Sequence, residues 1–209
     1  MSSYRLIEVA IAGDTPLMQY KFTDRAKAAM AATSRRTSTE ETRTTRQIAE
    51  EFVYTDAQGL VVFPGAAITT MMRQAGSNHK IPKSRKSVKG IVPAAVRMTE
   101  DSIEIYRVSG AAWARMTLQD FEVDSRPVVV PATKGRVMAH RPIFERWGAK
   151  FVLRINTSLI SEALVQKLLE EGGEQLGIGA FRPERGGTFG TFRVVSYGTL
   201  QEAEDTSSP

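Results

Sequence analysis

A stretch near the carboxy end, residues 177–190, brings together side chains that suit a polyanionic ligand. Its sequence, Gly-Ile-Gly-Ala-Phe-Arg-Pro-Glu-Arg-Gly-Gly-Thr-Phe-Gly, contains five of the sixteen glycines. Arginine pairs with phosphates and phenylalanine stacks on bases, while glycine permits positive φ and the close approach of another backbone. The stretch predicts contact with nucleic acid, although Gly-Gly pairs also fit a long flexible loop without a special role. The residues expected to make this contact are Gly177, Gly179, Phe181, Arg182, Arg185, Gly186, Gly187 and Phe189.

A long acid-free region precedes this stretch in the chain. Residues 57–99 contain seven Lys and Arg but no Asp or Glu, and their centre, residues 76–90, is polar and interrupted by Gly and Pro. A basic run is often only a solvated surface, but the lack of any compensating carboxylate favours a projecting insertion that binds phosphates. The residues expected to do so are Arg73, Lys80, Lys83, Arg85, Lys86 and Lys89.

Residues 126–142 form a second basic stretch without acidic residues. A Lys134-Gly135 turn between two valine-rich segments predicts a β-hairpin. Such a hairpin, with Arg136 near its tip, would reach over a bound strand or a neighbouring subunit. It would equally serve as an edge hairpin that its charges keep soluble. The sequence favours neither interpretation.

Patterns typical of catalysis or metal binding are missing from the sequence. The two histidines, His79 and His140, each lie in a basic stretch without the carboxylates that a zinc site would need, and there is no cysteine for a thiolate site or a disulfide. The glycine-rich stretch lacks the Gly-Lys-Ser/Thr of a phosphate-binding ATPase loop. Asp14 is expected to bond its own backbone in a Gly-Asp-Thr-Pro turn. We therefore expect no catalytic residue, metal or cofactor.

The charge of the chain favours an anionic partner. The net charge is +5 and the pI about 9.6. Residues 200–209 contribute three negative charges and no positive one, so the remainder carries +8. No apolar run is long enough to span a membrane. We expect a soluble, cytoplasmic protein that has no membrane partner.

Hydrophobic periodicity predicts an α+β domain. Two strand–helix–strand passages, one entering its helix at Pro64 and one over residues 150–197, predict a ferredoxin-like sheet within a single domain, residues 1–199. Residues 33–47 predict a flexible segment, and residues 200–209 an acidic disordered tail. The expected strands are 4–12, 60–63, 96–108 with a break at 99–101, 112–123, 150–156 and 191–197. The expected helices are a short one from Ala26, one over 67–75 that ends at Gly76, and one over 160–169 that stops at Gly172-Gly173.

Two of these segments resemble a known family. Residues 177–192 are similar to the carboxy-terminal glycine-rich loop of the RAMP superfamily, the crRNA-binding proteins of CRISPR effector complexes. Residues 60–73, Leu-Val-Val-Phe-Pro-Gly-Ala-Ala-Ile-Thr-Thr-Met-Met-Arg, are similar to the strand, Pro-Gly turn and first helix of that family, where a small and a basic residue line the guide RNA. The two motifs cover about thirty residues, and their order along the chain fits the family.

The resemblance implies a modified RNA-recognition-motif sheet with basic finger-like and thumb-like insertions, here about residues 76–92 and 124–141. It also implies a backbone subunit that forms a head-to-tail filament along single-stranded RNA, with copies of itself and other CRISPR effector subunits as partners. No convincing match exists to the aspartate with which some backbone subunits cut their target. The loop is also longer and less rich in glycine than in many relatives.

The leading hypothesis is therefore a non-enzymatic protein that coats single-stranded RNA through its backbone, with DNA left open as the ligand. A metal-dependent endoribonuclease of the same fold, with Asp14 or Asp56 at the scissile phosphate, is one alternative. A structural or assembly protein of a phage or mobile element, whose basic insertions contact acidic partners, is another.

Overall fold

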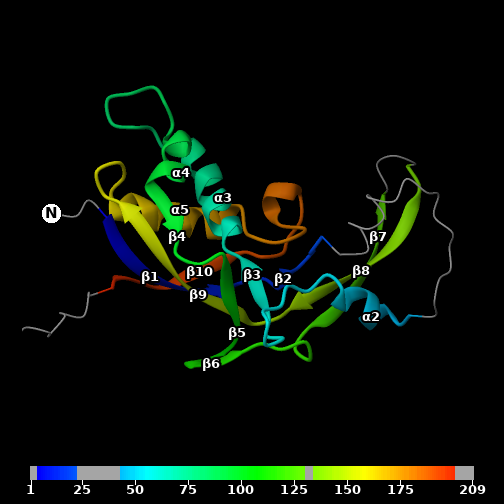
Figure 1. Cartoon of the computed structure of the whole chain (residues 1–209). Coiled ribbons are helices and arrows are strands. Elements are labelled where there is room, and N and C mark those ends of the chain that lie inside the picture. Colours follow the sequence, from blue (N-terminus) through cyan, green and yellow to red (C-terminus); the bar gives the residue numbers. More distant parts are fainter. Residues whose placement is uncertain (1–3, 23–42, 130–133, 201–209) are drawn as a thin grey trace, which may run out of the picture.

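The computed structural model describes residues 4–22, 43–129 and 134–200 (Figure 1). The short helix expected from Ala26, residues 33–42 of the segment expected to be flexible, and residues 201–209 of the expected tail lie outside these ranges. No helix in the described part of the chain is long and apolar enough to cross a membrane.

The main sheet is antiparallel and has the strand order of a ferredoxin-like fold. β1 (Tyr4–Gly13) lies between β10 (Phe192–Thr199) and β9 (Trp147–Asn156). The far side of β9 pairs with β4 (Val96–Met98) near one end and with β5 (Ser102–Ser109) near the other. β3 (Val62–Pro64) and β6 (Ala112–Arg115) extend the sheet from β5. The α+β, ferredoxin-like prediction is confirmed.

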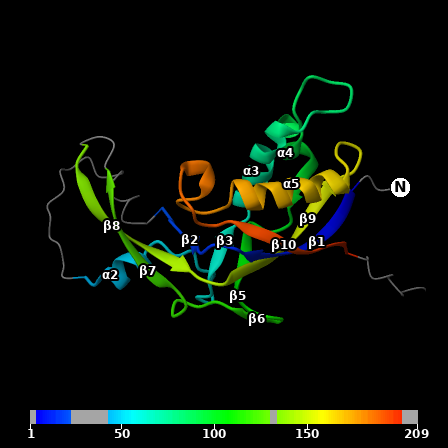
Figure 2. The ribbon, with the colours of Figure 1, turned by 180° about the vertical axis from the view of Figure 1, so that it is seen from behind.

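Two helices cover one face of this sheet, as Figures 1 and 2 show. They are α3 (Ala66–Ala75) and α5 (Glu162–Gln175). Alternate residues of β1 and β9 point toward them, because successive side chains of a strand face opposite sides of the sheet. The buried side chains of this core include Ile7, Val9, Ile11, Phe151, Leu153 and Ile155.

The first of the two predicted strand–helix–strand passages is assembled differently from the prediction. β3, the strand that enters α3, has only three residues and pairs at the periphery with β5. The strand that takes the ferredoxin position before α3 is β1, which pairs with β9 along nine residues. Residues 14–65 separate β1 from α3 in the sequence. The second passage, β9–α5–β10, is confirmed.

Gly172 and Gly173 do not stop the second helix, which continues to Gln175. Both glycines are buried and make room for close neighbours. A Cβ at Gly172 would lie 2.9 Å from the Cε of Met71 on α3. A Cβ at Gly173 would lie 2.5 Å from the carbonyl oxygen of Phe192 on β10. The pair is therefore a packing feature, because glycine allows α5 to approach α3 and β10 closely.

A smaller second sheet holds the predicted hairpin. β7 (Glu122–Val129) pairs with β8 (Arg136–Phe144), and β8 also pairs with β2 (Leu17–Met18). The strand predicted over residues 112–123 is in fact two strands, because Asp120 accepts hydrogen bonds from the amide and hydroxyl of Thr117 and makes a turn there.

The end of the segment predicted to be flexible is helical. α2 (Thr45–Glu50) begins with a capping box, in which Thr44 and Gln47 each accept a hydrogen bond from the other's amide. Arg46 of this helix also donates to the carbonyl groups of Leu118 and Phe121. These bonds attach α2 to the segment that leads into β7, so residues 43–47 are ordered.

The packing of α5 generates a stability prediction. Gly173→Ala should lower the free energy of unfolding by about 1–3 kcal/mol, the usual cost of overpacking. Alanine is otherwise favoured over glycine inside a helix by about 1 kcal/mol. The sign of the change in unfolding free energy therefore shows whether overpacking or helix propensity dominates. Glu174→Ala, at the next and exposed position, should change the stability by less than about 0.5 kcal/mol. Urea unfolding measures both variants, and a stabilised Gly173→Ala variant would contradict the packing account.

Candidate nucleic-acid interface

The glycine-rich loop, residues 177–190, is folded back on itself rather than extended. The amide of Ile178 donates to the carbonyl of Gly190 at 2.9 Å, and the amide of Phe189 donates to the carbonyl of Phe181 at 3.0 Å. A Cβ at Gly190 or at Gly187 would overlap the carbonyl groups of Ile178 and Phe181. Glycine at these two positions is therefore required for the two sides of the loop to meet. The loop is therefore a closed structure rather than a long flexible loop.

Phe181 has a left-handed backbone within this loop. Its φ is +55°, a conformation that costs a non-glycine residue free energy and that persists only where the surroundings enforce it. The neighbouring Gly179 and Gly186 also have positive φ, without that cost. The strained backbone holds the Phe181 ring on the surface, where 37% of the residue is exposed.

Two hydrogen bonds attach the loop to the start of the second sheet. Ala180 donates to the carbonyl of Met18, and Gly190 donates to that of Pro16, both at 2.9 Å. The other side of the loop faces α3 across a hollow of about 210 Å³, which we call the loop hollow. It is lined by Ala66, Ala67, Thr70, Met71, Gly177, Ile178, Gly179, Arg182 and Glu184. The two segments that resemble the RAMP motifs thus lie on opposite walls of one hollow.

The two arginines of the loop have different surroundings. The Arg182 guanidinium donates to the Glu184 carboxylate at 2.7 Å and to the Gly179 carbonyl at 2.9 Å, and its side chain is 23% exposed. Arg185 is exposed and forms no ion pair or side-chain hydrogen bond with another described residue. Arg182 therefore stabilises the loop, and Arg185 is the arginine that is free for a ligand.

The hairpin of β7 and β8 contacts the loop through one cation. The Arg126 guanidinium lies 4.8 Å from the centre of the Phe181 ring and 5.0 Å from that of Phe189. Asp124 binds the same guanidinium, with Nε to Oδ2 at 2.5 Å. This hydrogen bond raises the pKa of Arg126 above its ordinary value. The two rings expected to stack on bases thus hold the hairpin against the loop.

The finger-like insertion, residues 76–92, is fixed at its base and cationic beyond it. It contains the 3₁₀ turns η1 (Gly76–Asn78) and η2 (Val88–Gly90) and leads into α4 (Val92–Ala95). The His79 imidazole is 2.6 Å from the Glu171 carboxylate on α5, and this hydrogen bond holds the pKa of Glu171 below its ordinary value. Lys80, Lys83, Arg85 and Lys86 are exposed and Lys89 is half-buried, and none forms an ion pair within the described ranges.

The finger and the hairpin rise on the same side of the sheet, the side that holds α3 and α5 (Figures 1 and 2). The glycine-rich loop lies between α3 and the hairpin. Arg73, on the last turn of α3, and Arg136, on β8, are exposed. The expected site residues therefore gather on the helical side of the molecule.

The aspartates that a nuclease would need are engaged elsewhere. Asp14 pairs with Arg193. Desolvation disfavours the charged form of Asp56, but the amides of Leu60 and Gln58 and the Arg115 guanidinium together lower its pKa. Within the described ranges, no three Asp, Glu or His side chains are grouped as metal ligands would be.

Comparison with known proteins identifies the fold. A chain of the cryo-EM structure of Type III-B Cmr-beta bound to cognate target RNA matches with a TM-score of 0.50 and 12% identity, over 95% of this chain and 61% of that one. The chain has a RAMP-type fold. It spans about three-fifths of the length of the Cmr-beta chain that it matches. Cmr6 from Pyrococcus furiosus matches with a TM-score of 0.39 and 14% identity, over 92% of this chain and 99% of Cmr6.

By sequence, neither a protein-family model nor a curated protein matches the chain. The RAMP-type fold thus rests on the arrangement of strands and helices. The resemblance of residues 60–73 and 177–192 pointed to the same fold from the sequence alone.

Arg126 has a role in the site, the contact between hairpin and loop, that the sequence did not predict. It lies in the basic stretch 126–142, but nothing local distinguishes it from Arg136 or Arg141. Asp124, two residues before it, was the available signal. A carboxylate two residues away on the same face of a strand holds a guanidinium in a fixed position.

The contact between hairpin and loop predicts a change in local stability. Arg126→Ala should speed hydrogen exchange at the amides of Gly187 and Phe189 by on the order of tenfold, because a cation held between two rings contributes about 1–2 kcal/mol. Arg126→Lys keeps the charge but not the planar fork and should give a smaller effect. Arg136→Ala, on the same hairpin, should leave both amides unchanged. Equal exchange in the three variants would show that Arg126 does not connect hairpin and loop.

Proposed function

We propose that this chain is a non-enzymatic subunit that binds single-stranded RNA along its backbone, in the manner of the backbone subunits of CRISPR effector complexes. One observation carries the proposal: the loop hollow, with small residues of α3 on one wall and glycines on the other. Exposed cations without a described carboxylate partner lie on the loop, the finger and the hairpin.

The chemistry of the hollow suits a sugar–phosphate backbone. Ala66, Ala67 and Gly179 present little side-chain bulk, so a strand can approach the protein backbone closely. Arg185 at the loop and the lysines of the finger would neutralise phosphates at either side. Phosphate contacts contain no sequence information, so binding through them is only weakly specific and depends strongly on salt.

RNA is the ligand we propose in preference to DNA. Support comes from the RAMP-type fold, since the Cmr-beta structure that shares it is bound to target RNA. We propose no reaction for the chain. Asp14 and Asp56 are bound to arginines, so no specific observation favours the nuclease alternative.

The free cations predict the salt dependence of binding. Each lost phosphate contact to a single strand should make the log–log slope of affinity against salt less negative by about 0.7. Arg185→Ala should therefore change the slope by about 0.7, and Lys83→Ala/Arg85→Ala/Lys86→Ala by about 2. Fluorescence anisotropy with a labelled RNA oligonucleotide at several salt concentrations measures both.

The control removes a charge from the opposite face of the sheet. Lys150, on β9, lies 5.2 Å from the Trp113 ring and 5.5 Å from the Tyr106 ring on that face. Lys150→Ala should leave the slope unchanged. If Lys150→Ala changed the slope by about 0.7, while the loop and finger variants bound like the wild type, the proposed surface would be wrong.

Head-to-tail assembly along the strand is the second part of the proposal. One open interface repeated along a polymer gives a filament, so the number of chains per RNA should rise in proportion to RNA length. Light scattering after size-exclusion chromatography counts the chains on RNAs of two lengths. The RNA recovered from these complexes after incubation with Mg²⁺ should be full length. A single chain on every RNA would refute assembly, and cuts at regular spacing would refute the non-enzymatic assignment.

A further inference from the structure

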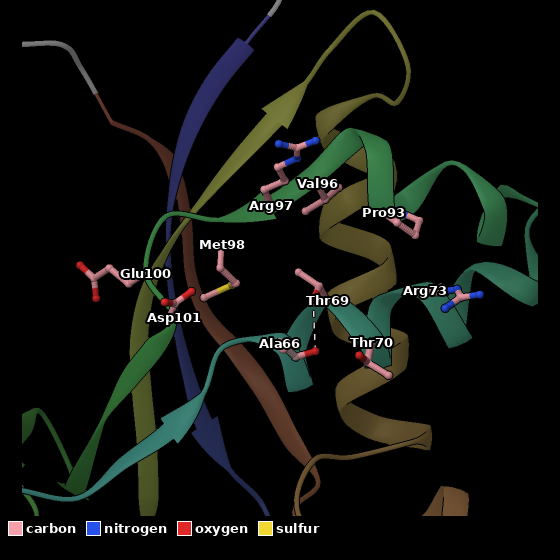
Figure 3. A pocket seen from close by; sticks show the side chains of 10 residues that line it. All are labelled: Ala66, Thr69, Thr70, Arg73, Pro93, Val96, Arg97, Met98, Glu100 and Asp101. Atoms are coloured by element: carbon pink, nitrogen blue, oxygen red, sulfur yellow. Dashed lines mark hydrogen bonds between the residues drawn. The ribbon is translucent and has the colours of Figure 1, made fainter. Parts of the chain in front are cut away.

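A second hollow lies on the other side of α3, between this helix, α4 and the turn from β4 to β5. Its volume is about 360 Å³, within the range of sites that hold small organic groups. Figure 3 shows the ten side chains that line it. Pro93, Val96 and Met98 form an apolar wall, and polar groups surround that wall. We call this the β4 hollow.

The β4 hollow and the loop hollow are neighbours on α3. Ala66 and Thr70 line both. These two small residues lie between the two hollows. A strand that crossed them from the glycine-rich loop toward Arg73 would pass the mouth of the β4 hollow.

Two cations and two carboxylates lie around the rim of the β4 hollow. Figure 3 shows Arg73 at one end of it, Glu100 and Asp101 at the other end and Arg97 along the edge between them, with the Arg73 guanidinium and the Glu100 carboxylate directed outward. Over the described part of the chain, none of these four side chains forms an ion pair or a hydrogen bond. Opposite charges thus share one hollow without neutralising each other, and all four are available to a ligand.

The two carboxylates are the feature that phosphate binding does not explain. Glu100 and Asp101 are the first acidic residues after the acid-free region 57–99, and they would repel a phosphate. A carboxylate accepts hydrogen bonds only from N–H and O–H donors. The exocyclic amine of a nucleobase is such a donor, and Asp and Glu accept from N4 of cytosine.

We propose that the β4 hollow receives one unstacked base of the bound strand and selects bases that have an exocyclic amine. The amine would donate to Glu100 or Asp101, the base would lie against Met98 and Val96, and the flanking phosphates would meet Arg73 and Arg97. This inference rests on the proposed function, and it adds a base preference to a surface that otherwise contacts only the backbone. Sequence-specific recognition of RNA commonly uses unstacked bases of this kind.

Cytosine and uracil test the inference directly, because they differ at position 4, an amine in one and a carbonyl in the other. Anisotropy with labelled oligo(C) and oligo(U) of equal length, at pH 7.5 and one salt concentration, should give about tenfold tighter binding of oligo(C). Tenfold corresponds to about 1.4 kcal/mol. Glu100→Gln/Asp101→Asn should reduce the ratio to about one, chiefly because oligo(C) loses affinity relative to oligo(U).

The matched control is Glu8→Gln/Glu145→Gln, which removes the same charge at exposed positions outside the hollow. It should keep the tenfold ratio. Equal binding of oligo(C) and oligo(U) by the wild type, or a tenfold ratio that persists in the pocket variant, would overturn the base pocket and leave RNA binding intact. If neither oligonucleotide bound at low salt, the proposed function itself would fail.

Discussion

The closure of the glycine-rich loop is the interaction on which the candidate interface depends. Its two sides meet through the Ile178–Gly190 and Phe181–Phe189 backbone bonds, and any side chain at Gly187 or Gly190 would separate them. The closed loop in turn fixes the position of Phe181 and Phe189, to which Arg126 connects the hairpin. These two backbone bonds thus fix the loop against which Arg126 holds the hairpin.

The arginines of this surface divide into two kinds. Arg126 and Arg182 are each bound to a carboxylate two residues away, so their charge is neutralised and they shape the surface. Arg73, Arg97 and Arg185 have no described partner. A polyanion gains most from charges that are not already paired, because displacing an existing partner would offset the new interaction. The paired arginines therefore hold the loop and the hairpin in position, whereas the unpaired arginines are available to contact phosphates.

The sequence predicted the elements better than their connections. Period-two alternation located β1 and β9, and helical spacing located α3 and α5, because each buries one face. The sequence wrongly predicted that Gly172 and Gly173 stop the helix. Their packing role depends on Met71 and Phe192, which are distant in the sequence. The sequence also placed β3, rather than β1, in the first strand–helix–strand unit. The pairing of β1 with β9 joins segments more than a hundred residues apart, so no local pattern reveals it. The basic surfaces followed from composition, whereas the internal pairing of Arg182 and the position of Arg126 required coordinates.

The most direct test of the RNA path is photo-crosslinking of a 4-thiouridine-substituted RNA to the protein, with the crosslinked peptides identified by mass spectrometry. If the RNA follows the proposed path, we expect crosslinks in α3, in the finger at residues 76–92 and in the loop at residues 177–190. Crosslinks confined to β1, β9 and β6 on the opposite face of the sheet would contradict it.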